Sequence, residues 1–184
     1  SGGAGYRVQS AAGTSGASPI HFSIFPAMPI IKYGTEEQKR EYLPKIASGE
    51  IMLGFSVTEP DAGTDTSRIK TMAVRDGADY VLNGKKVWSS NLQNASRTLI
   101  LTRTSALEAS DKPTMGMTLF LLDLKSKGVT IREIEKLGRK AVDSNELFLD
   151  NVRVPARDMI GEEGRGFYHL LAGLNGERFL ISAE

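Results

Sequence analysis

Residues 52–65 read Met-Leu-Gly-Phe-Ser-Val-Thr-Glu-Pro-Asp-Ala-Gly-Thr-Asp, a strand pattern that runs into a loop of small residues. Apolar Leu53, Phe55 and Val57 alternate with small or polar residues, so the two sets are expected on opposite faces of a strand. Pro60 has no N–H and a fixed φ, and the strand is therefore expected to end there.

The loop that follows, residues 61–65, has the composition of a ligand-binding turn. Gly63 can adopt a positive φ, and Thr64 offers a backbone N–H and a hydroxyl directly after it. Such a loop can bring donors against a flat, acceptor-rich ligand such as a flavin edge or a pyrophosphate. From these residues alone, a polar strand and an ordinary turn explain the pattern at least as well.

A second motif lies at residues 83–91, which read Asn-Gly-Lys-Lys-Val-Trp-Ser-Ser-Asn. The first motif contains Val-Thr-Glu-Pro at 57–60 and Ala-Gly-Thr-Asp at 62–65, and both motifs resemble the acyl-CoA dehydrogenase family. Asp61 departs from the family, which usually has a small residue there. The resemblance covers about residues 28–184 and implies a fragment of a longer protein. A third match is formed by Pro155, Ile160-Gly161, Gly164 and Gly166-Phe167.

The resemblance implies FAD as the cofactor. Trp88 resembles the residue that lies beside the flavin, and Ser90 resembles the hydroxyl near flavin N5. Ser89 takes a place that is commonly Ile or Val, so its expected contact is mainly through the backbone. Without the family, Trp88 is explained equally well as a core residue. The residues expected to bind FAD are Phe55, Val57, Thr58, Gly63, Thr64, Trp88, Ser89 and Ser90.

Residues 167–184 have the apolar period of a helix, and Glu177 and Arg178 interrupt its apolar stripe. An ion pair at a helix–helix joint is one explanation, because buried charges are costly unless they are paired. The resemblance offers another, since this helix borders the acyl-CoA site in the family. One branch, including the isovaleryl and long-chain enzymes, places its catalytic glutamate immediately before this arginine. Other branches place the base in a later helix. Glu177 is therefore the candidate base, with Thr64, Asn175 and Arg178 as candidate substrate contacts.

The reaction implied by the resemblance is α,β-dehydrogenation of an acyl-CoA thioester. A carboxylate takes the α-proton, the β-hydrogen leaves as hydride to flavin N5, and an electron-transfer flavoprotein reoxidises the flavin. The family further implies a homo-oligomer, a tetramer or a dimer, in the bacterial cytoplasm or the mitochondrial matrix. Three alternatives stay open: an acyl-CoA oxidase or desulfinase on the same fold, a flavin-binding module without turnover, and a plain β-barrel interaction domain.

Composition is that of a soluble globular protein. The chain carries 23 Lys and Arg against 22 Asp and Glu, which gives no reason to expect a nucleic acid or an anionic membrane as partner. Apolar runs stay well short of the ~20 residues that a membrane span needs. Cysteine is absent, which excludes disulfides and thiolate chemistry. No metal site is expected.

The expected fold class is α+β, with an antiparallel β-barrel or sandwich flanked by helices. A helix is expected over 35–49, because Thr35 and Gln38 have capping-box spacing and Gly49 can end it. Asn83-Gly84 predicts a hairpin between two strands. The expected domains are 1–51, the tail of an N-terminal helical domain; 52–160, the β-domain; and 161–184, the start of a C-terminal helical domain. The expected strands after the first are 69–75, 80–82, 85–90, 98–104, 117–123, 129–134 and 146–149.

Overall fold

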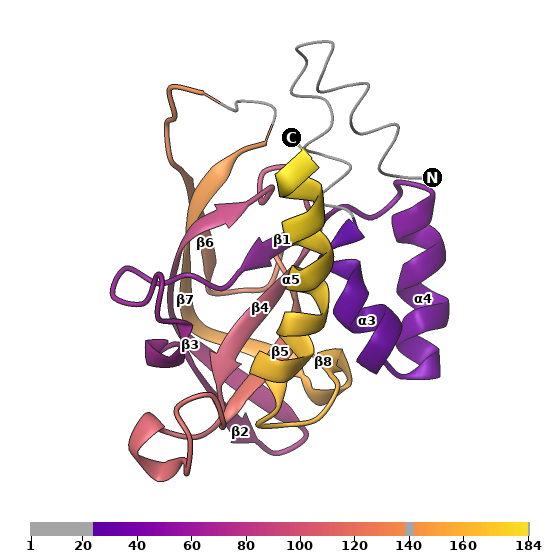
Figure 1. The fold of residues 1–184 in the computed structure, drawn as a ribbon. Coiled ribbons are helices and arrows are strands. Elements are labelled where there is room, and N and C mark those ends of the chain that lie inside the picture. Colours follow the sequence, from indigo (N-terminus) through magenta and orange to yellow (C-terminus); the bar gives the residue numbers. More distant parts are fainter. Residues whose placement is uncertain (1–23, 139–141, 184) are drawn as a thin grey trace.

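The computed structural model describes residues 24–138 and 142–183, and of residues 175–183 it describes the helical backbone alone. An eight-stranded sheet carries helices on one side, as Figure 1 shows. The helices are α3 (Ala27–Tyr33), α4 (Glu36–Ala47) and α5 (Gly166–Ala183). The strands are β1 (Leu53–Ser56), β2 (Met72–Asp76), β3 (Asp79–Ser90), β4 (Arg97–Arg103), β5 (Met117–Asp123), β6 (Val129–Glu133), β7 (Ser144–Pro155) and β8 (Met159–Ile160). Short 3-10 turns lie at Thr66–Arg68, Leu107–Ala109 and Ala156–Asp158.

Helix α4 confirms the prediction made from its capping residues. The Gln38 N–H donates to the Thr35 hydroxyl at 3.2 Å, and the Thr35 N–H donates to the Gln38 side chain at 2.9 Å. This capping box satisfies N–H groups at the helix start that have no partner within the helix. Gly49 takes a left-handed φ of 79° just beyond the helix, where a side chain would be strained.

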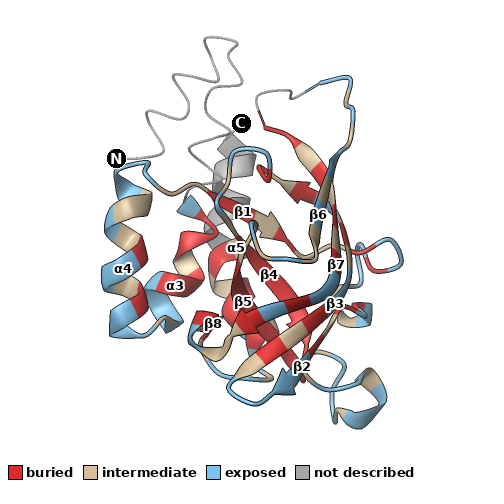
Figure 2. Cartoon of the chain, turned by 180° about the vertical axis from the view of Figure 1, so that it is seen from behind, coloured by how far each residue is buried: buried red, intermediate tan, exposed pale blue. Residues whose placement is uncertain are grey.

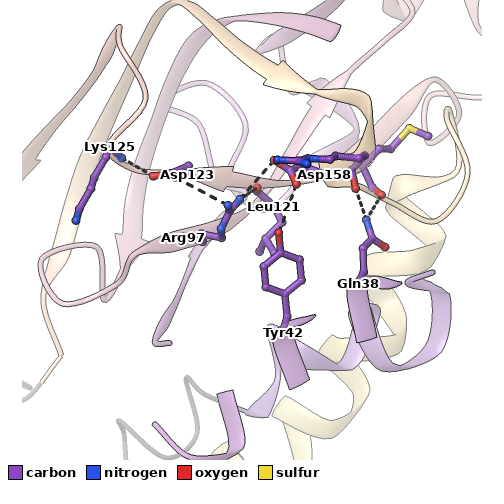
Figure 3. Close-up of polar contacts among 9 residues, drawn as sticks. Gln38, Tyr42, Arg97, Leu121, Asp123, Lys125 and Asp158 are labelled. Carbon is purple, nitrogen blue, oxygen red and sulfur yellow. Dashed lines mark hydrogen bonds and ion pairs between the residues drawn. The ribbon is translucent and has the colours of Figure 1, made fainter. Parts of the chain in front are cut away.

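Helix α4 is joined to the sheet by polar contacts, which Figure 3 shows in detail. The Gln38 side-chain amide donates to the carbonyl oxygens of Arg157 and Met159 at 2.7 and 2.8 Å. The Tyr42 hydroxyl donates to the Asp158 carboxylate at 3.5 Å. These bonds connect α4 to the segment that leads into β8, so the helix packs as part of one unit with the strands.

Arg97 of β4 completes this cluster. Its guanidinium lies 3.4 Å from the Asp158 carboxylate and donates to the Leu121 carbonyl at 3.2 Å. It also lies over the Tyr42 ring, 5.3 Å from the ring centroid. Burial raises the pKa of Tyr42 to about 12, although Arg97 opposes the rise. Burial likewise raises the pKa of Asp158, and again Arg97 opposes it.

The order of the strands is β6-β7-β3-β1-β4-β5-β8, and β2 pairs with both β3 and β4. Strand β1 pairs with the end of β3 at Ser90, while β2 pairs with the start of β3, from Asp79 to Asn83. The two short strands therefore share one place between β3 and β4. Within the described residues, the hydrogen-bonded path starts at β6 and finishes at β8 without joining these two ends.

The predicted antiparallel pairing holds for most neighbouring strands but is wrong for two pairs. Strands β1 and β4 are parallel, with Leu53 opposite Arg97, and β2 and β4 are parallel at Met72 and Arg103. Parallel neighbours need a crossover, and the intervening hairpin of β2 and β3 supplies it between β1 and β4. The mixed α+β class is confirmed.

Strands β4 and β5 are buried on both faces. Their apolar residues point alternately into two hydrophobic clusters, one on each side of the sheet. The first cluster includes Leu99 and Leu101 of β4, with residues of all three described helices. The second includes Ile100 between them, with residues of β2, β3 and β7. Strand β5 divides its residues in the same way. Figure 2 accordingly shows these central strands largely in the red of buried residues.

The hairpin predicted at Asn83-Gly84 is wrong, because β3 continues through both residues. The Asn83 side chain accepts from the Asn151 N–H at 2.8 Å instead of closing a turn. Gly84 has a φ of 152°, and the pairing with β7 shifts register beside it. A Cβ on Gly84 would lie 2.5 Å from the Thr71 hydroxyl. This glycine therefore serves a close backbone approach at a bulge.

Helix α5 confirms the helix predicted over 167–184 as far as the described residues go. It begins where the backbone of Gly166 passes close to Thr118 and Leu119, leaving no room for a Cβ. Leu170 is buried in the first cluster. Among the described helices, none combines the length and the apolar character needed to cross a bilayer.

Candidate functional site

The two sequence motifs lie side by side in the structure. Phe55 of β1 stands opposite Ser90 of β3 in antiparallel register. Just beyond β1, the Val87 N–H donates to the Thr58 carbonyl at 2.9 Å. Residues 55–58 therefore run along residues 87–90, which brings together the two segments that carry most of the expected FAD-binding residues.

Trp88 is exposed at the centre of this arrangement, with 58% of its surface accessible. Its φ is 58°, and the pairing of β3 with β7 shifts register between Lys86 and Ser89. A positive φ is uncommon for a residue with a large side chain. The bulge turns the indole out of the strand, so the alternative of Trp88 as a core residue is wrong. An exposed aromatic face is available to a flat ligand.

The loop after β1 is a tight turn followed by an exposed segment. Glu59 and Ala62 exchange backbone hydrogen bonds of 3.2 and 3.1 Å around Pro60 and Asp61. Gly63 follows and is exposed, but it does not adopt the positive φ that the sequence allowed. A Cβ at Gly63 would meet nothing within 4 Å, which leaves open space beside the loop.

The structure places Thr64 in the exposed part of this loop. The side chain of Asp65, its neighbour, accepts from the Ser67 N–H at 3.1 Å and starts the 3-10 turn Thr66–Arg68. The hydrogen bond at Asp65 therefore fixes the end of segment 63–65, and Thr64, within this last part of the first motif, is exposed to solvent.

A buried ion pair that the sequence analysis missed connects the two motifs. The Lys86 ammonium donates to the Glu59 carboxylate at 2.8 Å and to the Val57 carbonyl at 3.0 Å. The same carboxylate accepts from the N–H groups of Lys70 at 2.6 Å and Thr71 at 3.0 Å. The sequence carried only a general signal, because the first motif contains acidic residues and the second contains two lysines, Lys85 and Lys86.

Burial governs the protonation of this pair. It lowers the pKa of Lys86 to about 8, although Glu59 opposes the fall. Burial also tends to raise the pKa of Glu59, but the charge of Lys86 and the donated hydrogen bonds hold it below its ordinary value. Both groups are therefore charged at neutral pH.

Behind the second motif lies a network of polar side chains. The Asn145 side-chain amide donates to the Ser89 carbonyl at 3.1 Å, and the Asn91 amide donates to the Leu53 carbonyl at 3.2 Å. Asp143 accepts from the Gln93 N–H at 3.1 Å. These bonds connect the end of β3 and the residues after it to β1 and β7.

The two serines of the motif differ in their surroundings. Ser90 is partly exposed at the end of β3. Ser89 is 1% exposed, and its hydroxyl has no hydrogen-bond partner in the described part of the chain. The surroundings of this side chain are therefore suited to an apolar residue, and the backbone contact expected at position 89 stays a prediction.

The remaining candidates, Asn175, Glu177 and Arg178, lie in the second half of α5. Their side chains fall outside the described residues, so their roles stay predictions. Earlier in the helix, Gly173 packs against α3 and the residues before it, since a Cβ there would lie 2.8 Å from the Phe25 carbonyl and 3.3 Å from the Pro29 ring.

Comparisons with known proteins agree with the motifs. The model of "Acyl-CoA dehydrogenase, middle domain" matches residues 54–152, and that of "Acyl-CoA dehydrogenase, N-terminal domain" matches residues 7–50. The long-chain specific acyl-CoA dehydrogenase of Sus scrofa is 40% identical over 157 residues, which cover 84% of this chain and 36% of that protein.

Solved structures match as well. An acyl-CoA dehydrogenase from Geobacillus kaustophilus has a TM-score of 0.80 at 38% identity, covering 84% of this chain and 40% of that one. A glutaryl-CoA dehydrogenase from Mycobacterium smegmatis, in complex with FADH2, has a TM-score of 0.80 at 36% identity, covering 91% of this chain and 41% of that one. The chain spans less than half the length of these relatives. The matches to sequence, motifs and fold show that this chain belongs to the acyl-CoA dehydrogenase family.

Proposed function

We propose that this chain is the flavin-binding part of an enzyme that dehydrogenates an acyl-CoA thioester between its α and β carbons. The observation that carries the proposal is the joining of the two motifs through the Val87–Thr58 hydrogen bond, next to the exposed ring of Trp88. Membership of the family supports the reaction class.

The residues present fit FAD. The exposed indole of Trp88 offers a flat apolar face, and the open space at Gly63 admits a ligand close to the backbone. The remaining expected contacts come from Val57, Thr58 and Ser90 on the two joined segments. Bound FAD supplies the redox chemistry by accepting the hydride, and the protein supplies the binding site and the orientation. Phe55, Thr64 and Ser89 complete the proposed set.

Glu177 is the proposed base for the α-proton. A carboxylate can act as a base near neutral pH when an apolar pocket raises its pKa, and an apolar helix face can supply such a pocket, while the charge of the adjacent Arg178 would oppose the rise. Arg178 and Asn175 follow as proposed substrate contacts on the same helix, with Thr64 on the loop. The support for these helix residues is that their positions in the sequence fall within α5 and match the family's helix at the acyl-CoA site.

Further proposals concern the larger assembly. The domain division is 1–51, 52–160 and 161–184, supported by family models that match on either side of residue 51. The sheet then forms the barrel or sandwich of the middle domain. The partner for the electrons is an electron-transfer flavoprotein, and the complete protein is a dimer or tetramer in the bacterial cytoplasm or the mitochondrial matrix.

Two measurements test the function. FAD titrated into the 184-residue chain is expected to bind weakly and to quench the fluorescence of Trp88, the only tryptophan of the chain. In the longer protein that contains this chain, an acyl-CoA is expected to bleach the flavin absorbance, with electrons passing to an added carrier. Oxygen consumption without a carrier would indicate an oxidase, and a protein that ignores FAD would contradict the proposal.

The base is tested by Glu177→Gln in the longer protein. The variant keeps the size of the side chain and removes its basicity, so flavin reduction is expected to slow by about 10²-fold or more. FAD content should stay unchanged. Reduction at the parental rate would mean that the base lies elsewhere and that Glu177 is structural.

A further inference from the structure

The buried ion pair of Lys86 and Glu59 joins the two motifs at their closest point. Lys86 is 0% exposed and Glu59 is 6% exposed, and their charged atoms lie 2.8 Å apart. Lys86 is two residues before Trp88, and Glu59 directly follows Thr58. The pair therefore gives the two segments a second connection, directly next to the Val87–Thr58 hydrogen bond.

Stability alone is a weak reason for such a pair. Taking two charges out of water costs several kcal/mol per ion, and replacing a buried pair with apolar residues is often neutral or stabilising. The geometry here is unusually complete, since the Glu59 carboxylate also accepts two backbone N–H groups and the Lys86 ammonium also donates to the Val57 carbonyl. What the pair provides is a fixed distance between residues 57–59 and residues 86–88, two segments that are far apart in sequence.

The bulge at Trp88 needs this fixation. A bulky residue with positive φ is an unfavourable conformation that persists only where the surroundings over-determine it. Lys86 fixes the strand on one side of the bulge, and the Asn145 side chain holds the Ser89 carbonyl on the other. The backbone between them is thereby fixed, and with it the direction in which the Trp88 side chain leaves the strand.

We infer that Lys86 and Glu59 are positioning residues for the flavin, holding the Trp88 ring and the Thr58 backbone at a set separation before the cofactor binds. This inference rests on the proposed function for the identity of the ligand. Neither residue needs to touch the flavin. The effect is preorganisation, in which the supporting residues lock the conformation of those that contact the ligand.

The test compares single variants with their combination in the 184-residue chain. Lys86→Met and Glu59→Gln each leave one buried charge without its opposite charge and are expected to lower the unfolding midpoint in urea. The double variant Lys86→Met/Glu59→Gln removes both charges together, so its midpoint is expected to recover towards that of the parent chain. The double variant no longer has the Lys86 ammonium, which in the parent chain joins the Val57 carbonyl to the Glu59 carboxylate.

Two further readouts distinguish positioning from stability. In the absence of FAD, Trp88 fluorescence anisotropy is expected to fall in the double variant, because the ring is no longer fixed. FAD affinity is expected to fall by about tenfold or more, since small misplacements of contacting groups have large effects. The matched control is Lys85→Met, which removes the neighbouring ammonium of the more exposed pair with Glu146 and should leave both readouts unchanged.

Each outcome is decisive. A double variant with recovered stability and parental anisotropy would overturn the inference, as would an equal change in Lys85→Met. A double variant that fails to recover stability but keeps parental anisotropy in its folded fraction would overturn it too. If the longer protein that contains this chain does not bind FAD, the proposed function is contradicted, while the anisotropy comparison without FAD would still decide whether the pair positions Trp88.

Discussion

The Gln38 side-chain amide donates to the carbonyl oxygen of Arg157 at 2.7 Å, across 119 positions of sequence. Gln38 also closes the capping box of its own helix with Thr35. One side chain therefore fixes both the start of α4 and the docking of α4 on the segment before β8. Residues of the proposed N-terminal helical segment and of the β-domain are thus structurally coupled.

Gln38→Ala is expected to lower the free energy of unfolding by about 2 kcal/mol, because it removes two side-chain hydrogen bonds at the helix–sheet contact and half of the capping box. Urea unfolding of the chain measures the change. Thr35→Ala is the matched control, since it removes only the cap, at about 1 kcal/mol. A Gln38→Ala variant no less stable than Thr35→Ala would show that the bonds to the Arg157 and Met159 carbonyls contribute little.

Tyr42 is expected to remain protonated until about pH 12, because burial raises its pKa to that value. A raised pKa stabilises the folded chain below the ordinary value of 10.0, and this contribution is lost as the pH rises through the folded value. The difference in phenolate absorbance between the parent chain and Tyr42→Phe isolates this group among five tyrosines. A difference signal that titrates near the ordinary value would contradict the burial seen here.

Local patterns in the sequence predicted local structure well. Helix α4 follows from its capping residues, and β5 follows from an apolar run at the predicted residues 117–123. The spacing of the two motifs, together with family resemblance, identified the segments that the structure joins. These features depend on neighbours along the chain, where propensity and periodicity act directly.

Features that depend on distant partners were not predictable from the same patterns. Asn83-Gly84 is a strong hairpin signal, but β3 is paired with β7 along its whole length, and this pairing overrides the local preference. The parallel pairing of β1 with β4 likewise depends on topology. The contact of Lys86 with Glu59 could be recognised only after the two motifs were known to be adjacent.

Gly84→Ala is expected to destabilise the chain by about 2 kcal/mol or more, because the added Cβ would lie 2.5–2.8 Å from Thr71 and the φ of 152° disfavours a side chain. Gly77→Ala is the matched control. Its φ of 62° is also unfavourable, but nothing lies within 4 Å of the added carbon, so about 1 kcal/mol is expected. Urea unfolding of both variants checks the comparison. Equal losses would mean that the approach to Thr71 relaxes at no cost.

Ser89→Ala is expected to leave the free energy of unfolding unchanged or to increase it by about 1 kcal/mol, because the buried hydroxyl has no partner in the described residues. FAD affinity should also stay unchanged if position 89 acts through its backbone. Ser56→Ala is the control, since the Ser56 hydroxyl is bonded to that of Thr98 at 2.9 Å and its loss should destabilise. A clear loss of FAD affinity in Ser89→Ala would instead assign the hydroxyl a direct contact with the ligand.

The stability contributed by Glu59 is expected to disappear in acid. Lys86 and two N–H groups hold its pKa below the ordinary 4.5, so the ionised carboxylate stabilises the folded chain above that pH, and the contribution is lost as the pH falls through the folded value. Glu59→Gln cannot titrate and leaves Lys86 without a charged partner, which should cost roughly 3–5 kcal/mol at neutral pH.

The difference in unfolding free energy between the parent chain and Glu59→Gln should therefore be largest at neutral pH and shrink below 4.5. Taking the difference cancels the opposite trend of Asp158, whose pKa is raised by burial and whose ionisation weakens the fold as the pH rises through that window. Glu146→Gln, at the exposed pair with Lys85, should change stability by less than about 1 kcal/mol. A parent–Glu59→Gln difference that stays constant into acid would mean that the carboxylate stabilises through its shape and not through its charge, which would also remove the electrostatic basis for the link between the two motifs.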